Sequence, residues 1–254
     1  MHRRVSMIVA RKFPFGDWLV GRLIYSSLHK HFDRIYFRTR VRSVERHLPI
    51  IVCANHFSWW DGYIAYLVEH YLKLDGYLMM EEAQLRRYFF FAWAGCFSVN
   101  REHARSAMQS IQYAARLLKE RPGRLVWLFP QGEIVPNDRR PLTFFSGAAH
   151  LARLTCPSLL YPLASRIEYM AEQRPDLYIS LGAPLMVTED MSREVGFLKH
   201  CTRQLETSVT AELDQLRDDV IACRRDDFTL LMRGQASTNR IFDSLLFRKQ
   251  IARH

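Results

Sequence analysis

The sequence predicts an α/β fold in which helices flank a mixed, mostly parallel β-sheet. Short, apolar and β-branched runs such as Ile50–Ala54 and residues 125–129 are typical of buried strands. Between such runs lie longer segments whose apolar residues recur at helical spacing, as in residues 103–120. Because strands alternate with helices along the chain, we expect helices on both faces of the sheet.

The predicted elements follow one another from the amino terminus. A helical region reaches about His31, and the alternation over 34–41 predicts an edge or half-buried strand. Apolar runs predict further strands at 50–54, 76–80, 96–100, 125–129, 158–163 and 176–181. Helical spacing predicts helices after Asp61 and over 82–88, 103–120 and 198–220.

The length and composition indicate one main domain with small appendages. The chain has 254 residues, of which 48% are hydrophobic, and this is enough for a sizeable core. We predict an amphipathic helical segment for membrane association over 1–31, a main domain over 32–224 and a basic carboxyl-terminal tail over 225–254. The five cysteines are scattered without a Cys-x-x-Cys spacing, so we expect no disulfide framework and no metal site.

The charge pattern favours an anionic membrane surface as a partner. Basic residues outnumber acidic ones by 36 to 26, which gives a net charge of +10. Basic residues also flank bulky apolar ones at both ends, as is typical of an interfacial anchor, although such faces can instead pack on the protein's own core. The residues concerned are Arg11, Lys12 and Arg22 around Phe13, Phe15, Trp18, Leu19 and Leu23, and Arg240, Arg248, Lys249 and Arg253 around Ile241, Phe242, Leu245, Leu246 and Ile251.

We expect the protein to lie peripherally on the cytoplasmic face of a membrane. The apolar stretch near the amino terminus is interrupted by Arg11 and Lys12 before it reaches the length of a signal peptide. The longest charge-free stretches, 47–60 and 88–100, are shorter than the roughly 18 apolar residues of a spanning helix. The sequence therefore predicts neither a signal peptide nor a transmembrane helix.

The most informative motif is His56-x4-Asp61, which lies between a predicted strand and a predicted helix. His56 thus follows the carboxyl end of a strand, the edge where ligands bind in open α/β sheets. A neutral imidazole held by a carboxylate can take a proton from a hydroxyl, so the pair is a candidate general base with its orienting acid. In the alternative interpretation, Asp61 or Ser58 caps the helix. His70 and Asp75 have the same spacing, so spacing alone does not decide between these two interpretations.

Three further segments place functional groups at or near strand ends. Arg101 and Gln131-Gly132-Glu133 each follow a predicted strand, and Pro162 lies in a third. Arginine suits phosphate or carboxylate, and glycine allows close approach to the backbone. Each segment also has a simpler interpretation, as a surface charge, a turn or the mark of an edge strand.

Taken together, four sequence blocks occur in a specific order. They are Asn55-His56-x4-Asp61, Gly95-x5-Arg101, Phe129-Pro130-Gln131-Gly132-Glu133-Ile134 and Tyr161-Pro162-Leu163. This order resembles the glycerolipid acyltransferase superfamily, which carries Asn-His-x4-Asp, Gly-x5-Arg, Phe-Pro-Glu-Gly-Thr-Arg and a strand with a proline. The resemblance runs from about Ile50 to Val187 and identifies 32–224 as an acyltransferase domain.

The resemblance implies an O-acyltransferase that acts on a lipid acceptor. His56 is expected to act as general base on the acceptor hydroxyl, with Asp61 orienting it, and the oxygen attacks the thioester of acyl-CoA or acyl-carrier protein. This thioester is a co-substrate, and no cofactor or metal is required. Arg101 is expected to hold a phosphate of the donor or acceptor. The other residues expected in the substrate site are Asn55, Gln131, Gly132, Glu133 and Pro162.

Departures from the family pattern bear on the acceptor. The family's Glu, Thr and Arg are replaced here by Gln131, Glu133 and Ile134, and its later Lys by Phe145. Two cations suited to a phosphomonoester are therefore absent, although Arg139 and Arg140 lie nearby in the sequence. We expect a lysophospholipid with a substituted head group, a glycolipid or another hydroxylated lipid as acceptor, rather than lysophosphatidate.

Other classes of function fit less well. A catalytically weak relative that binds a lipid or a partner protein is the main alternative, since the third block is altered. A metal- or nucleophile-dependent hydrolase would need more metal ligands or an activated Ser or Cys, and the Gly-x-Ser-x-Gly motif is absent. The positive charge would suit nucleic acid, but no recognisable nucleic-acid-binding module is present, so we expect no such partner.

Overall fold

The computed structural model describes residues 7–170, 172–238 and 242. Its helices are α1 Pro14–His31, α2 Asp61–Tyr71, α3 Glu82–Arg87, α4 Ala104–Glu120, α5 Gly147–Thr155, α6 Glu189–Arg193 and α7 Phe197–Ile221, with a 3-10 helix, η1, at Phe89–Ala94. Its strands are β1 Arg34–Thr39, β2 Ile50–Ala54, β3 Asp75–Glu81, β4 Cys96–Val99, β5 Arg124–Leu128, β6 Ser158–Glu168, β7 Asp176–Leu181, β8 Leu185–Val187 and β9 Thr229–Arg233. Every predicted strand and helix is present, and the α/β class is confirmed.

The described strands form one mixed sheet in the order β4-β3-β5-β2-β6-β7-β1-β9, with β8 beside β6. The strands from β4 to β6 run parallel to one another, β7 pairs antiparallel with β6, and β1 pairs parallel with β7. The mostly parallel sheet is therefore confirmed. In its parallel part, the carboxyl ends of the strands meet at one edge, and the segments that carry His56, Arg101 and Gln131 begin there.

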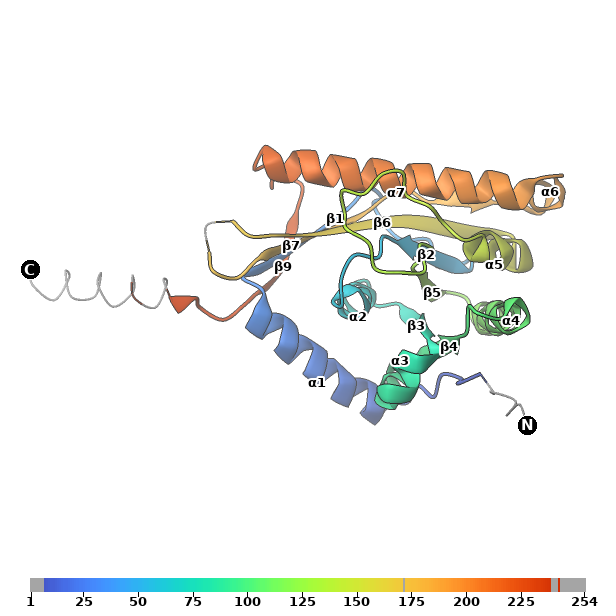
Figure 1. Ribbon diagram of the computed structural model, residues 1–254, viewed down its shortest axis with the longest axis horizontal. Coiled ribbons are helices and arrows are strands. Elements are labelled where there is room, and N and C mark those ends of the chain that lie inside the picture. Colours follow the sequence, from blue (N-terminus) through green and yellow to red (C-terminus); the bar gives the residue numbers. More distant parts are fainter. Residues whose placement is uncertain (1–6, 171, 239–241, 243–254) are drawn as a thin grey trace, which may run out of the picture.

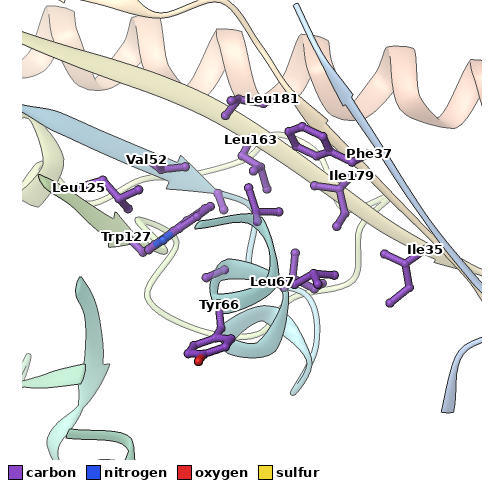
Figure 2. Close-up of a cluster of buried hydrophobic side chains, with 14 of the residues drawn as sticks. Ile35, Phe37, Val52, Tyr66, Leu67, Leu125, Trp127, Leu163, Ile179 and Leu181 are labelled. Carbon is purple, nitrogen blue, oxygen red and sulfur yellow. The ribbon is translucent and has the colours of Figure 1, made fainter. Parts of the chain in front are cut away.

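The core is divided between the two faces of the sheet, because successive side chains of a strand point to opposite faces. Figure 1 shows α7 across one face and α1 and α2 across the other. In β2, Ile50 and Val52 belong to the cluster beside α1 and α2, whereas Ile51 and Cys53 belong to the cluster beside α4, α5 and α7. Figure 2 shows the first cluster, with Val52 on the sheet and Leu67 on α2.

The strand predicted over 34–41 is present as β1, but the prediction that it is an edge or half-buried strand was wrong. β1 lies between β7 and β9, and its side chains from Ile35 to Arg38 are buried. Arg38 makes the pattern resemble a surface strand, but its guanidinium donates to Asp219 of α7 at 2.5 Å and to Ser180 at 3.2 Å. A charge that is paired and hydrogen-bonded can be buried, and sequence alternation does not distinguish that case.

The elements β8, β9, η1, α5 and α6 were not predicted. β9 falls within the range predicted as a basic tail, yet it pairs antiparallel with β1. It lacks the buried apolar run of a central strand, since no residue of β9 is fully buried. Most of the predicted carboxyl-terminal anchor, including Arg240, Arg248, Lys249 and Arg253, lies outside the described residues.

The amino-terminal helix α1 is present, but it does not divide cleanly into an apolar and a polar face. Its inner side, with Val20, Ile24 and Leu28, is buried in the core cluster that includes α2. Its outer side carries the exposed rings of Phe15 and Trp18. One side of this helix therefore packs on the protein's own core, and a membrane role for its exposed aromatic side stays a prediction. Among the described residues, no helix is long and apolar enough to span a membrane.

Candidate active site

His56 and Asp61 lie at the carboxyl edge of the sheet, between the end of β2 and the start of α2. Nδ1 of His56 is 2.6 Å from Oδ2 of Asp61. An ionised carboxylate can only accept a hydrogen bond, so a neutral imidazole in this position donates from Nδ1 and leaves the lone pair of Nε2 free. Asp61 is 2% exposed, whereas the imidazole lines a cavity. The arrangement is that of a base held in one orientation by a buried acid.

Donors from its own turn hold the Asp61 carboxylate in place. Oδ2 accepts the main-chain N–H groups of Phe57 at 2.8 Å and Ser58 at 3.0 Å, and Oδ1 accepts the Ser58 hydroxyl at 2.9 Å. The N-cap of α2 is Trp60, with no side-chain hydrogen bond at this cap, and the main-chain N–H groups that Asp61 accepts precede the helix. The alternative in which Asp61 caps the helix is therefore wrong, whereas the Ser58 hydroxyl does accept the Trp60 N–H at 3.2 Å in the turn that leads into the helix.

The second pair with the same spacing, His70 and Asp75, does not form. Nδ1 of His70 lies 2.9 Å from the Tyr66 carbonyl oxygen, and Nε2 lies 3.3 Å from Asp17. Asp75 instead accepts a hydrogen bond from Lys12 at 3.2 Å. Of the two His-x4-Asp pairs in the sequence, only His56 and Asp61 are therefore in contact.

Residues of the third block hold both the ring and the backbone of His56. The Phe129 ring stacks on the imidazole with 4.8 Å between centroids. The side-chain oxygen of Gln131 accepts the His56 main-chain N–H at 2.7 Å, and the His56 carbonyl accepts the Val135 N–H at 2.9 Å. Gln131 is 8% exposed. We infer that Gln131 is a positioning residue for His56.

Replacing Gln131 by alanine should lower kcat by about tenfold, because leaving a buried N–H without its partner costs about 1–3 kcal/mol. Gln131→Glu should keep most of the activity, since a carboxylate oxygen accepts the same N–H. The measurement is kcat as a function of pH for both variants, together with thermal unfolding. A loss of equal size in both variants would contradict the positioning role, and so would a change confined to KM.

Arg101 extends over the loop that follows β5. A Cβ on Gly132 would collide with its guanidinium and with the Phe145 ring, and the φ of 76° at this glycine also disfavours other residues. The Arg101 side chain makes no ion pair or hydrogen bond with the residues that the structure describes. Arg101, Gly132 and Glu133 all line the cavity. The Arg101 charge is thus placed where a bound anion can use it.

Asn55 and Pro162 lie outside the cavity wall. The Asn55 amide donates to the Ser165 carbonyl at 3.0 Å and to Asn137 at 2.7 Å, and its oxygen accepts the Ser165 N–H at 2.8 Å. Pro162 lies in a central strand, between the part of β6 that pairs with β8 and the part that pairs with β7. Its interpretation as an edge-strand marker was therefore wrong. Both residues support the backbone around the site.

A cavity of about 790 Å³ opens beside His56. Its mostly apolar wall comes from α1, α2, β3, η1, α4, α5 and the loop after β5. The large apolar side chains Trp59, Ile134 and Phe145 line it and are exposed, so they mark its open rim. A concave, apolar site of this size with few polar groups suits a ligand with a long hydrophobic part.

Glu69 is a buried charged residue in the cavity wall, two turns along α2 from Asp61. The Trp127 indole donates to its Oε2 at 3.0 Å, and Lys12 lies 3.9 Å from its Oε1. Burial raises the pKa of the Glu69 carboxyl to about 7. Lys12 was predicted to face a membrane, but it is half-buried and belongs to this internal network.

The arginines that lie near the third block do not replace the missing cations in the cavity wall. Arg140 donates to Asp214 of α7 at 2.5 Å, and Arg139 is exposed without lining the cavity. The positions that carry cations in the family pattern are Ile134 and Phe145, which are 55% and 64% exposed. The rim is therefore more apolar than the family pattern implies.

Sequence reasoning missed the residues that form the inner part of the cavity. Val20 and Ile24 of α1 and Tyr66 and Glu69 of α2 line it. The one available signal was Glu69, a carboxylate in an otherwise apolar stretch over 63–69. Within the described residues, no cluster of three or more histidine, cysteine or acidic side chains is placed to hold a metal ion.

Comparison with known proteins adds one finding to this geometry. A family model described as Acyltransferase matches residues 35–166, just over half of the chain. The matched range contains His56, Asp61, Arg101 and the loop after β5. A comparison with curated proteins found no significant match.

Proposed function

The chain belongs to the glycerolipid acyltransferase family, and we propose that it moves a fatty acyl group from acyl-CoA or acyl-carrier protein to the hydroxyl of a lysophospholipid, glycolipid or similar lipid. The observation that carries the proposal is the 2.6 Å contact between His56 Nδ1 and Asp61 Oδ2 at the wall of an apolar cavity. The contact supports a general base, and the cavity supports a substrate with a long apolar part.

In the proposed reaction, Nε2 of His56 takes the proton of the acceptor hydroxyl while the hydroxyl oxygen attacks the thioester carbonyl carbon. The tetrahedral intermediate then collapses, the C–S bond breaks, and the imidazolium returns the proton to the leaving thiolate. The products are an ester and a free thiol, and no acyl-enzyme forms. Asp61 stabilises the imidazolium during the reaction. Arg101 holds a phosphate of the donor or acceptor beside this base.

Thiol release tests the proposed function. Acyl-CoA and acyl-carrier-protein donors are incubated with a panel of lysolipid, glycolipid and lipid-alcohol acceptors, and the ester product is identified by mass spectrometry. We expect thiol release that depends on the acceptor and equals the amount of ester formed. Lipid binding without such release from any pair would instead support the catalytically weak relative.

We also propose that an outer aromatic surface of the protein binds an anionic membrane. This surface comprises the exposed Phe15, Trp18 and Leu23 of α1 and Phe89 of η1. Arg22 lies over the Trp18 ring at 5.5 Å, so a cation accompanies the aromatic groups. Exposed aromatic and basic side chains on one helix suit the boundary between head groups and acyl chains.

Binding to vesicles that contain anionic lipid should be reversible and should weaken at high salt, because salt screens surface charge. Replacing Phe15 and Trp18 together by serine should reduce the bound fraction severalfold in a flotation assay. Ile221→Ser is the matched control, since Ile221 is exposed on α7, which covers the other face of the sheet. Equal binding to anionic and neutral vesicles would contradict the electrostatic part of this proposal.

A further inference from the structure

The cavity beside His56 extends over both faces of the sheet. Consecutive residues of a strand point to opposite faces, yet Leu78 and Met79 of β3 both line the cavity. Leu128 and Phe129 at the end of β5 also line it, and they too belong to opposite core clusters. The cavity therefore passes over the carboxyl edge of the sheet, with one arm on each side and His56 at that edge.

The first arm lies on the side of α1 and α2. Gly62 and Glu69 of α2 both line it, and residues seven apart on a helix are about 10 Å apart along its axis. Its apolar wall includes Val20, Ile24, Tyr63, Leu78 and Phe91. Away from His56, the wall includes the Glu69 carboxyl, which is held by the Trp127 indole. A long, mostly apolar arm whose carboxyl is already bonded to Trp127 suits one unbranched hydrocarbon chain.

The second arm lies on the side of α4 and α5. Its wall is formed by Ala104, Ala107, Met108, Ile111 and Ala148, so most of its side chains are small. Its rim carries the Phe145 ring and the Arg101 guanidinium, which has no ion pair with the described residues. Small wall residues beside an exposed aromatic rim suit a wider apolar body whose polar group lies near Arg101.

We propose that the first arm binds the acyl chain of the donor and the second arm binds the hydrophobic body of the acceptor, so that their reacting ends meet at His56. This inference rests on the proposed acyl transfer. It makes the acceptor an amphiphile whose apolar part enters the protein between α4 and α5. Holding the two chains on opposite sides of the sheet edge brings a hydroxyl and a thioester together at one base. Such positioning of two reactants contributes a large part of the rate enhancement in reactions of this kind.

Two matched substitutions test the assignment, because each places a phenylalanine in one arm. Ala107→Phe narrows the second arm and should raise the KM of an acceptor with a long apolar body by about tenfold, with little effect on the KM of the donor. Leu78→Phe narrows the first arm and should raise the KM of a long-chain acyl thioester by about tenfold. With a short-chain thioester, the rise in donor KM caused by Leu78→Phe should be much smaller than with a long-chain thioester.

Further variants keep the test decisive. Gln112→Phe is the control, because Gln112 is exposed on α4 and does not line the cavity. If Ala107→Phe does not fold, Met108→Ala enlarges the same arm and should improve turnover of a bulkier acceptor only. The assignment would be overturned if a substitution in either arm changed the KM of the donor and the KM of the acceptor equally. It would also be overturned if acceptors with short and long apolar parts had equal kcat/KM. Absence of acceptor-dependent thiol release in the unmodified protein would instead overturn the proposed function itself.

Discussion

His56→Ala is expected to abolish measurable acyl transfer, and Asp61→Asn to lower kcat by roughly 10²–10⁴-fold. Without the imidazole, the acceptor hydroxyl loses the base that takes its proton. In Asp61→Asn, an amide replaces the carboxylate that accepts from Nδ1 at 2.6 Å and from two main-chain N–H groups. The imidazole can then carry its hydrogen on Nε2, and in that tautomer Nε2 has no lone pair with which to take the proton of the acceptor hydroxyl. Steady-state thiol release at saturating donor and acceptor measures both effects.

His70→Ala and Asp17→Asn are the matched controls for this prediction. They alter the same residue types in a contact of 3.3 Å between Nε2 and a carboxylate oxygen, away from the cavity wall. Both variants should retain activity close to that of the unmodified protein, with thermal unfolding confirming that all variants fold. If His70→Ala abolished turnover while His56→Ala retained it, the assigned site would be wrong.

Lysophosphatidate is expected to be a poor acceptor compared with a lipid of the same chain that lacks the terminal phosphate. Each charge-assisted hydrogen bond contributes about 1.5–3 kcal/mol, so losing two cations costs about 3–6 kcal/mol, or roughly 10²–10⁴ in kcat/KM. Ile134 and Phe145 stand at those two positions, line the cavity and are exposed, so they also add apolar surface for a neutral acceptor. The measurement is kcat/KM for the two acceptors with one common donor.

Two sets of variants test the reason for this preference. Ile134→Arg combined with Phe145→Lys should raise kcat/KM for lysophosphatidate selectively, because both positions line the cavity. Arg140→Ala should have no selective effect, since Arg140 already donates to Asp214. Efficient turnover of lysophosphatidate by the unmodified protein, with its KM raised selectively by Arg139→Ala or Arg140→Ala, would show that these arginines compensate and that the prediction was mistaken.

The α/β class, the family and the existence of the predicted elements followed from the sequence alone. Apolar β-branched runs and helical spacing record burial and local backbone geometry, which are properties of short segments. The candidate pair could be predicted from the sequence for the same reason, because His56 and Asp61 are in contact within the single turn between β2 and α2. The order of the four blocks carried the family assignment, which the family model over 35–166 confirms.

Only the tertiary structure decided which partners these residues have. Gln131 holds the His56 backbone from 75 residues away, Asn55 bonds to Ser165 over 110 residues, and Arg38 pairs with Asp219 over 181 residues. The two-sided cavity likewise depends on how strands distant in sequence pair at one edge. A sequence pattern records whether a side chain is apolar and how often it recurs, but not which distant group will lie against it, because that contact forms only when the chain is folded.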